Sequence, residues 1–101
     1  MPDRHRSPRA LIALPCTLRR RIGSPIVAQT VEVGPEGMCV SSPRPLAADE
    51  TVTFDLPDLD IRITGSARVL RQQRHNVYVL RFEHLPAPMV NRLHALAINR
   101  R

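Results

Sequence analysis

The sequence predicts an all-β fold, a small six-stranded antiparallel barrel followed by a C-terminal α-helix. Three observations predict this architecture. Apolar and β-branched residues alternate with polar residues in several short runs, which is typical of half-buried strands. Glycine, proline and asparagine separate these runs at short intervals, as turns between strands require. Closing many short strands into a barrel also removes exposed sheet edges.

The chain begins with a basic arm, residues 1–9, in which two prolines disfavour a helix. The first strand is expected over 11–21. It contains Pro15, which indicates a sheet edge or a bulge because proline cannot donate to a strand ladder. A turn at 22–25 follows.

Residues 26–41 are expected to form a hairpin, because two apolar runs flank the turn sequence GPEG at 34–37. A loop with two prolines at 43–49 then leads to a short strand at 51–56, whose apolar residues share one face.

The fifth expected strand, 59–72, is long and alternates in polarity. Gly65, near its middle, indicates a bend or a bulge. After a turn at 74–76, residues 77–83 form the sixth strand.

Apolar residues then recur at helical spacing, which predicts a helix over about 87–99. We expect its apolar stripe to pack on the barrel; the stripe consists of Met89, Val90, Leu93 and Leu96. The sequence thus predicts one domain, with a flexible basic arm over 1–9, a barrel over about 10–84 and this helix.

Charge and cysteine content limit the partners. All 15 cationic residues are arginine and the net charge is +6, which favours anionic partners without naming one. Cys16 and Cys39 form no CxxC pair, so two reduced, buried thiols are expected, although a single disulfide stays open. The four histidines lack metal spacing, and no run of 18 apolar residues is present. We therefore expect a cytoplasmic protein with no metal, no cofactor and no membrane insertion.

Enzymes and nucleic-acid binders fit the sequence less well. Ser41 and Ser42 have no evident base, and the carboxylates fall in or beside expected turns. We therefore expect that the protein is not an enzyme. Single-strand binding needs aromatic stacking surfaces. The chain offers only Phe54, Tyr78 and Phe82, and alternation places both phenylalanines in the core.

The order of the arm and the hairpin resembles the PilZ domain. The signature of that family is RxxxR in an N-terminal arm, followed by [D/N]xSxxG at a hairpin. Further likeness lies in GMCVSSPRPLAADETVTFDLP (37–57), ITGSARVLRQ (63–72) and YVLRFEHL (78–85). The resemblance covers nearly the whole chain and implies a bacterial, PilZ-like barrel that binds cyclic di-GMP.

The resemblance also implies which residues form the site. In that family, arm arginines grip phosphates and guanine edges, and the hairpin supplies a carboxylate or amide and a glycine where the backbone comes close. The corresponding ligand-binding residues here are Arg9, Gly37, Arg4, Arg6, His5, Glu32 and Gly34.

The match departs from the signature at several positions. Aligning the second arginine on Arg9 places His5 at the first, although a shift of the arm would offer Arg4 or Arg6 instead. At the hairpin, Glu32 replaces Asp or Asn and Gly34 replaces Ser; Gly37 matches. Losing one bidentate contact weakens binding by about 1–3 kcal/mol.

Two functions follow from the resemblance. One is a cyclic di-GMP receptor and adaptor, weakened by its degenerate motif, that signals through a protein partner. The other is an adaptor that acts without the nucleotide, for example in type IV pilus or motility regulation.

Overall fold

The computed structural model describes residues 8–57 and 62–99. Within them it contains a 7-stranded sheet and one helix. The strands are β1 (Ala10–Leu11), β2 (Pro15–Arg19), β3 (Ile26–Val33), β4 (Gly37–Ser41), β5 (Thr51–Leu56), β6 (Ile63–Arg74) and β7 (Val77–Glu83).

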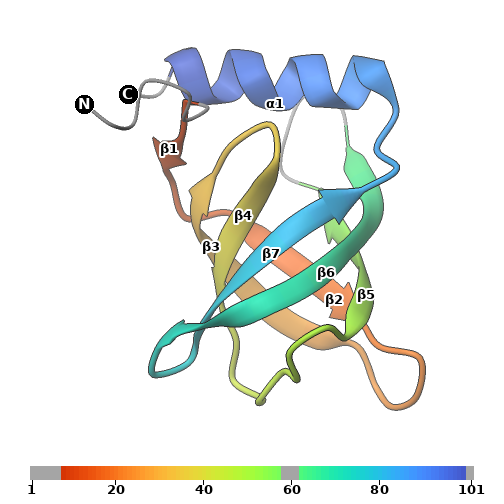
Figure 1. Ribbon diagram of the computed structural model, residues 1–101. Coiled ribbons are helices and arrows are strands. Elements are labelled where there is room, and N and C mark those ends of the chain that lie inside the picture. Colours follow the sequence, from red (N-terminus) through yellow and green to blue (C-terminus); the bar gives the residue numbers. More distant parts are fainter. Residues whose placement is uncertain (1–7, 58–61, 100–101) are drawn as a thin grey trace.

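Strands β2 to β7 close into an antiparallel barrel. They follow the order β3-β2-β5-β6-β7-β4, and pairing between β3 and β4 completes the circle. The two-residue β1 pairs with the end of β3 and adds no member to the circle. Helix α1 (Ala87–Asn99) lies across one end of the barrel (Figure 1). The predicted six-stranded barrel with a C-terminal helix is therefore confirmed.

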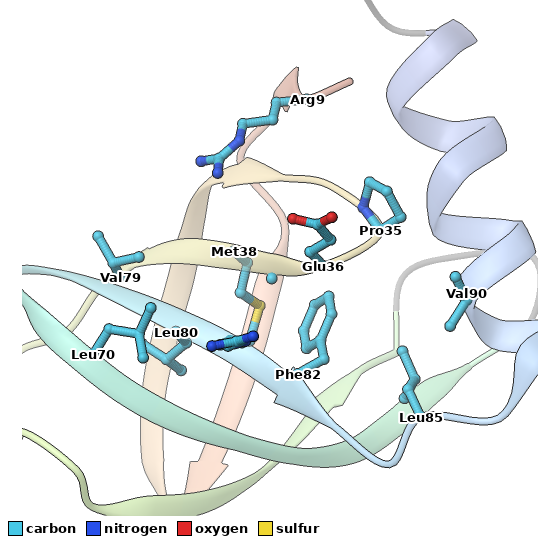
Figure 2. A pocket seen from close by; sticks show the side chains of 12 residues that line it. Arg9, Pro35, Glu36, Met38, Leu70, Val79, Leu80, Phe82, Leu85 and Val90 are labelled. Carbon is cyan, nitrogen blue, oxygen red and sulfur yellow. The ribbon is translucent and has the colours of Figure 1, made fainter. Parts of the chain in front are cut away.

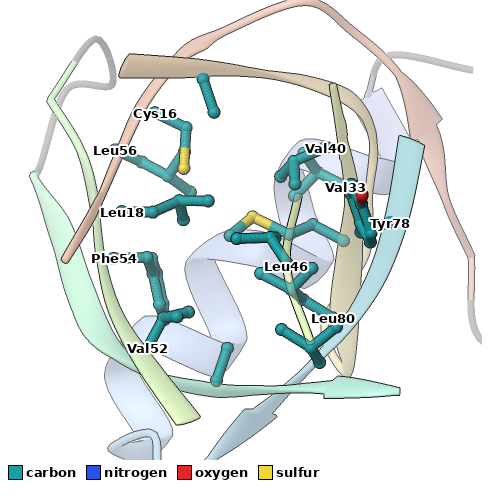
Figure 3. Close-up of a cluster of buried hydrophobic side chains, with 14 of the residues drawn as sticks. Cys16, Leu18, Val33, Val40, Leu46, Val52, Phe54, Leu56, Tyr78 and Leu80 are labelled. Atoms are coloured by element: carbon teal, nitrogen blue, oxygen red, sulfur yellow. The ribbon is translucent and has the colours of Figure 1, made fainter. Parts of the chain in front are cut away.

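Side chains alternate between the two faces of each strand, and those that point inward fill the interior of the barrel (Figure 3). Leu18 and Leu56 are fully buried. Burying one leucine side chain stabilises the folded state by about 1.5–3 kcal/mol. The rings of Phe54 and Phe82 pack with their centroids 4.9 Å apart. Both phenylalanines belong to or pack against this core, as alternation predicted.

Helix α1 closes the barrel through its apolar stripe. Leu93 and Ala97 are fully buried, and Met89 and Leu96 pack against the barrel core. This confirms the expected packing on the barrel for Met89, Leu93 and Leu96. Val90 instead lines a surface hollow described below.

The strand expected over 11–21 is interrupted, because a buried threonine replaces part of its ladder. The amide of Leu14 donates to Oγ1 of Thr30 at 2.8 Å, and that hydroxyl donates to the carbonyl of Ile12 at 2.6 Å. The chain therefore leaves the sheet between β1 and β2, and the pairing register with β3 shifts by one residue. β2 ends at Arg19, short of the predicted end.

The prediction of a bulge at Gly65 is wrong, because the β5–β6 ladder keeps one register on both sides of this residue. The missing side chain instead makes room for neighbours: a Cβ there would lie 2.8 Å from Cδ1 of Leu85. The bulges of β6 lie at Leu70 and Gln73, where it pairs with β7. Residues 58–61, which include the expected start of this strand, lie outside the described residues.

Both cysteines are free thiols and buried. Burial raises the pKa of Cys16 to about 12, so this thiol stays protonated at neutral pH. Within residues 8–57 and 62–99, no helix has the length and apolarity that crossing a membrane would take. The same residues hold no group of three or more His, Cys, Asp or Glu side chains placed to bind a metal ion.

Candidate ligand-binding site

Residues 8–9, the end of the N-terminal arm, cross the β3–β4 hairpin at Gly34. A Cβ on Gly34 would lie 2.8 Å from the carbonyl oxygen of Pro8 and 3.3 Å from Cγ of Arg9. The next residue, Ala10, is fully buried and pairs with Val33, which anchors the arm. The absence of a side chain at Gly34 therefore leaves the space that the arm occupies.

This crossing brings Arg9 to Glu32. Nη1 of Arg9 donates a hydrogen bond to Oε1 of Glu32 at 3.0 Å, and the two side chains are 42% and 27% exposed. At such exposure, an ion pair stabilises the fold by less than about 1 kcal/mol. The structure thus joins two of the predicted site residues, one from the arm and one from the hairpin.

Cys39 lies beside this ion pair on β4. Its neighbours Met38 and Val40 belong to the core, so alternation turns Cys39 to the outer face, where it pairs with Glu32. Its thiol donates to Oε1 of Glu32 at 3.7 Å and lies 3.4 Å from Oε1 of Gln73. Burial and the Glu32 carboxylate raise the pKa of Cys39, so it is a neutral donor at neutral pH.

Gly37 is required by the packing of two strands. A Cβ there would lie 2.1 Å from the carbonyl oxygen of Leu80 and 3.1 Å from Cα of Arg81, both on β7. The turn before it is closed by the amide of Gly34, which donates to the carbonyl of Gly37 at 2.9 Å. Gly37 therefore has a structural role that is independent of any ligand.

A surface hollow of about 480 Å³ lies between the arm, the β3–β4 turn, β7 and α1 (Figure 2). Its volume falls within the usual range of small-molecule sites, about 300–1,000 Å³. Its apolar lining includes Leu70, Val79, Leu85 and Val90, and its charged lining consists of Arg9, Glu36 and Arg81. The hollow therefore offers apolar surface framed by two guanidinium groups.

The predicted site residues fall into two groups. The structure brings together Arg9, Glu32, Gly34 and Gly37. Arg4, His5 and Arg6 lie outside the described residues. The sequence analysis did not name Arg81, although alternation along β7 places it on the face opposite the buried Leu80 and would have found it.

Comparisons with known proteins identify the family and the fold. A family model described as PilZ domain matches residues 3–99. A search of curated protein sequences finds no match.

Two solved structures are similar to the chain. The Bacillus subtilis inhibitor of motility MotI/DgrA has a TM-score of 0.79 and 15% identity over 96% of this chain, which spans 50% of that protein. The PilZ domain of CeSA from a cellulose synthesizing bacterium has a TM-score of 0.70 and 16% identity, over 92% of this chain and 97% of that one. At these identities the likeness shows the fold alone.

Proposed function

The chain belongs to the PilZ domain family. We propose that it is a cyclic di-GMP receptor that controls a protein partner. One observation carries the proposal: Arg9 of the arm meets Glu32 of the hairpin beside a hollow of about 480 Å³. The arm and the hairpin are the two segments to which the family resemblance assigns the ligand.

The side chains at this place suit a cyclic dinucleotide chemically. A guanidinium fork matches phosphate oxygens and the acceptor edge of guanine, and a carboxylate accepts from guanine N–H groups. Arg9 uses Nη1 for Glu32, which leaves the other N–H groups of its guanidinium for an anion. The ion pair thus holds Arg9 in place before the ligand arrives.

The apolar part of the hollow suits the faces of purine bases. Val79 contributes aliphatic surface from β7, Leu85 from the loop after β7, and Val90 from the start of α1. A ligand seated there would touch both the barrel and the helix. The bound ligand would therefore change the surface that is available to a partner protein. A receptor that catalyses no reaction can transmit a signal in this way.

The role of a partner protein rests on the family and on one structural neighbour. That neighbour is by its title an inhibitor of motility. We extend to this chain only the general role of modulating another protein.

Calorimetric titration of the purified protein with cyclic di-GMP tests the proposal. We expect saturable binding that Arg9→Ala weakens by about tenfold or more, since a hydrogen bond to a charged group contributes about 1.5–3 kcal/mol. Arg44→Ala is the matched control, because Arg44 is exposed and lines no part of the hollow. Its affinity should equal that of the wild type.

One observation favours the alternative, an adaptor that works without the nucleotide. Arg9 is already paired with Glu32, and the packing against β7 is enough to explain Gly37. If titration of the folded protein with cyclic di-GMP at high concentration releases no heat of binding, the result would support this alternative and reject the receptor function.

A further inference from the structure

Strand β6 carries two bulges along its pairing with β7. At each, two residues of β6 face one residue of β7, and the extra residues are Leu70 and Gln73. The register on either side pairs Val69 with Leu80, Arg71 with Val79, Gln72 with Tyr78, and Arg74 with Val77. Bulges commonly re-aim side chains near functional sites.

The bulges bring three arginines of β6 onto one face. In a regular strand, residues three apart point to opposite faces. Because each bulge adds one residue, the arginines take alternate register positions: Arg68 pairs with Arg81, Arg71 with Val79, and Arg74 with Val77. These β7 residues alternate with Tyr78 and Leu80, which point into the core. The outer face of β6 and β7 therefore gathers four arginines.

This arginine face adjoins Arg9. Register partners run across four strands in one row: Glu32 on β3, Cys39 on β4, Val79 on β7 and Arg71 on β6. At about 4.8 Å per strand, the row spans about 15 Å between its ends. Arg9 is paired with Glu32 at one end, and Arg71 stands at the other. Arg81 lies two residues along β7 from Val79 and lines the hollow with Arg9.

The arginines of this region differ in whether their charge is already neutralised. Arg68 pairs with Glu83 at 2.9 Å, and Arg9 pairs with Glu32 at 3.0 Å. Within residues 8–57 and 62–99, neither Arg71 nor Arg81 forms an ion pair with another residue. Both are exposed. Arg81 lines the hollow, and Arg71 follows Leu70, which also lines it. An anion seated at this edge of the hollow would therefore meet both guanidinium groups uncompensated.

We propose that Arg71 and Arg81 hold the phosphates of the cyclic dinucleotide, an inference that rests on the function proposed above. The apolar surface between them, formed by Leu70 and Val79, takes the face of a base. In this arrangement Arg9 and Glu32 bind at one end of the ligand, and the β6–β7 face binds its phosphodiester groups. The bulge at Leu70 is what turns Arg71 toward the ligand.

The test compares two charge-matched double variants by calorimetric titration with cyclic di-GMP. Arg71→Gln with Arg81→Gln removes the proposed phosphate contacts. Arg44→Gln with Arg74→Gln removes two exposed arginines to which the proposal assigns no contact with the ligand. We expect at least about tenfold weaker binding for the first variant and less than about threefold for the second. Urea unfolding of each variant establishes that it is folded.

The outcomes separate this inference from the proposed function. If the wild type binds and Arg9→Ala weakens binding by about tenfold or more, while the Arg71 and Arg81 variant binds within about threefold of the wild type, the function stands and this inference is overturned. Equal weakening of both double variants also overturns it, because net charge alone would then explain the loss. If the folded wild type does not bind at all, both proposals fail. Arg71→Lys, which keeps the charge but loses the planar fork, should weaken binding if the contact is bidentate.

Discussion

The barrel has a regular side and an irregular side. On the regular side, β2–β3, β2–β5 and β5–β6 each keep a single pairing register. On the irregular side, β3–β4 shifts at Val31 and β6–β7 shifts at Leu70 and Gln73, although β4–β7 between them keeps one register. The chain also leaves the sheet between β1 and β2. Residues 8–9 of the arm, the hollow and the Arg9–Glu32 ion pair all lie on the irregular side.

The difference indicates that one part of the barrel holds the core and another part positions the side chains of the candidate site. Regular ladders bury alternate residues and hold the core, whereas each irregularity turns a side chain to a place that alternation would not give it. The regular side has its own charged contact, in which Arg20 donates to both oxygens of Glu50 at 2.5 and 2.9 Å. That pair ties the end of β2 to the start of β5, and it lines no part of the hollow near Arg9.

The largest effect should come from Gly37→Ala on the irregular side. Its Cβ would lie 2.1 Å from a backbone oxygen of β7, which cannot move without opening the barrel. We expect a loss of about 3 kcal/mol in the free energy of unfolding, measured by urea titration. Gly65→Ala is the control on the regular side, since its nearest neighbour is the flexible end of Leu85 at 2.8 Å. Equal losses of stability in Gly37→Ala and Gly65→Ala would show that the close backbone contact at Gly37 does not distinguish the two sides.

Thr30→Val should have the next largest effect. It removes the hydroxyl that bonds Leu14 and Ile12 where the chain leaves the sheet, and it leaves both backbone groups without that partner. The expected loss is about 2–3 kcal/mol, with faster hydrogen exchange at the amide of Leu14. Thr53→Val, at an exposed position of β5, should change stability by less than about 0.5 kcal/mol. Unchanged exchange at Leu14 would contradict the proposed tie.

Glu50→Gln should produce a smaller, pH-dependent loss on the regular side. The hydrogen bond from Arg20 lowers the pKa of Glu50 in the folded protein, so the carboxylate stabilises the fold at pH values above its unfolded pKa of about 4.3. We expect the wild type to be more stable than the variant by about 1–2 kcal/mol at pH 7. As the pH falls through the folded pKa, this difference should vanish. A difference that persists at low pH would exclude the ionised pair as its cause.

Arg9→Ala should have the smallest effect on stability, because its ion pair with Glu32 is largely exposed. The expected loss is about 0.2–1 kcal/mol. A loss above about 2 kcal/mol in urea unfolding would mean that the pair is a structural contact like Arg20–Glu50. A small loss would leave ligand binding as the role that sets Arg9 apart from Arg20.

Part of the site was predictable from the sequence. Arg9, Glu32, Gly34 and Gly37 were named through a family resemblance, and the structure brings them together. Arg71 and Arg81 were not named. Simple alternation over 59–72 puts Arg68 and Arg71 on opposite faces, and the glycine that indicated a bulge lies away from both bulges.

The sequence by itself determined that the barrel has six strands and which faces of β5 and β7 are buried. β5 and β7 have their predicted bounds, because alternation follows from the geometry of a single strand. Only the tertiary structure decided the register. Each bulge, and the break after Leu11, depends on what a partner strand offers, as when Thr30 presents a hydroxyl in place of a regular ladder. Pairing partners lie far apart in the chain. Which side chain or strand bonds a given backbone group is therefore determined only when the barrel closes.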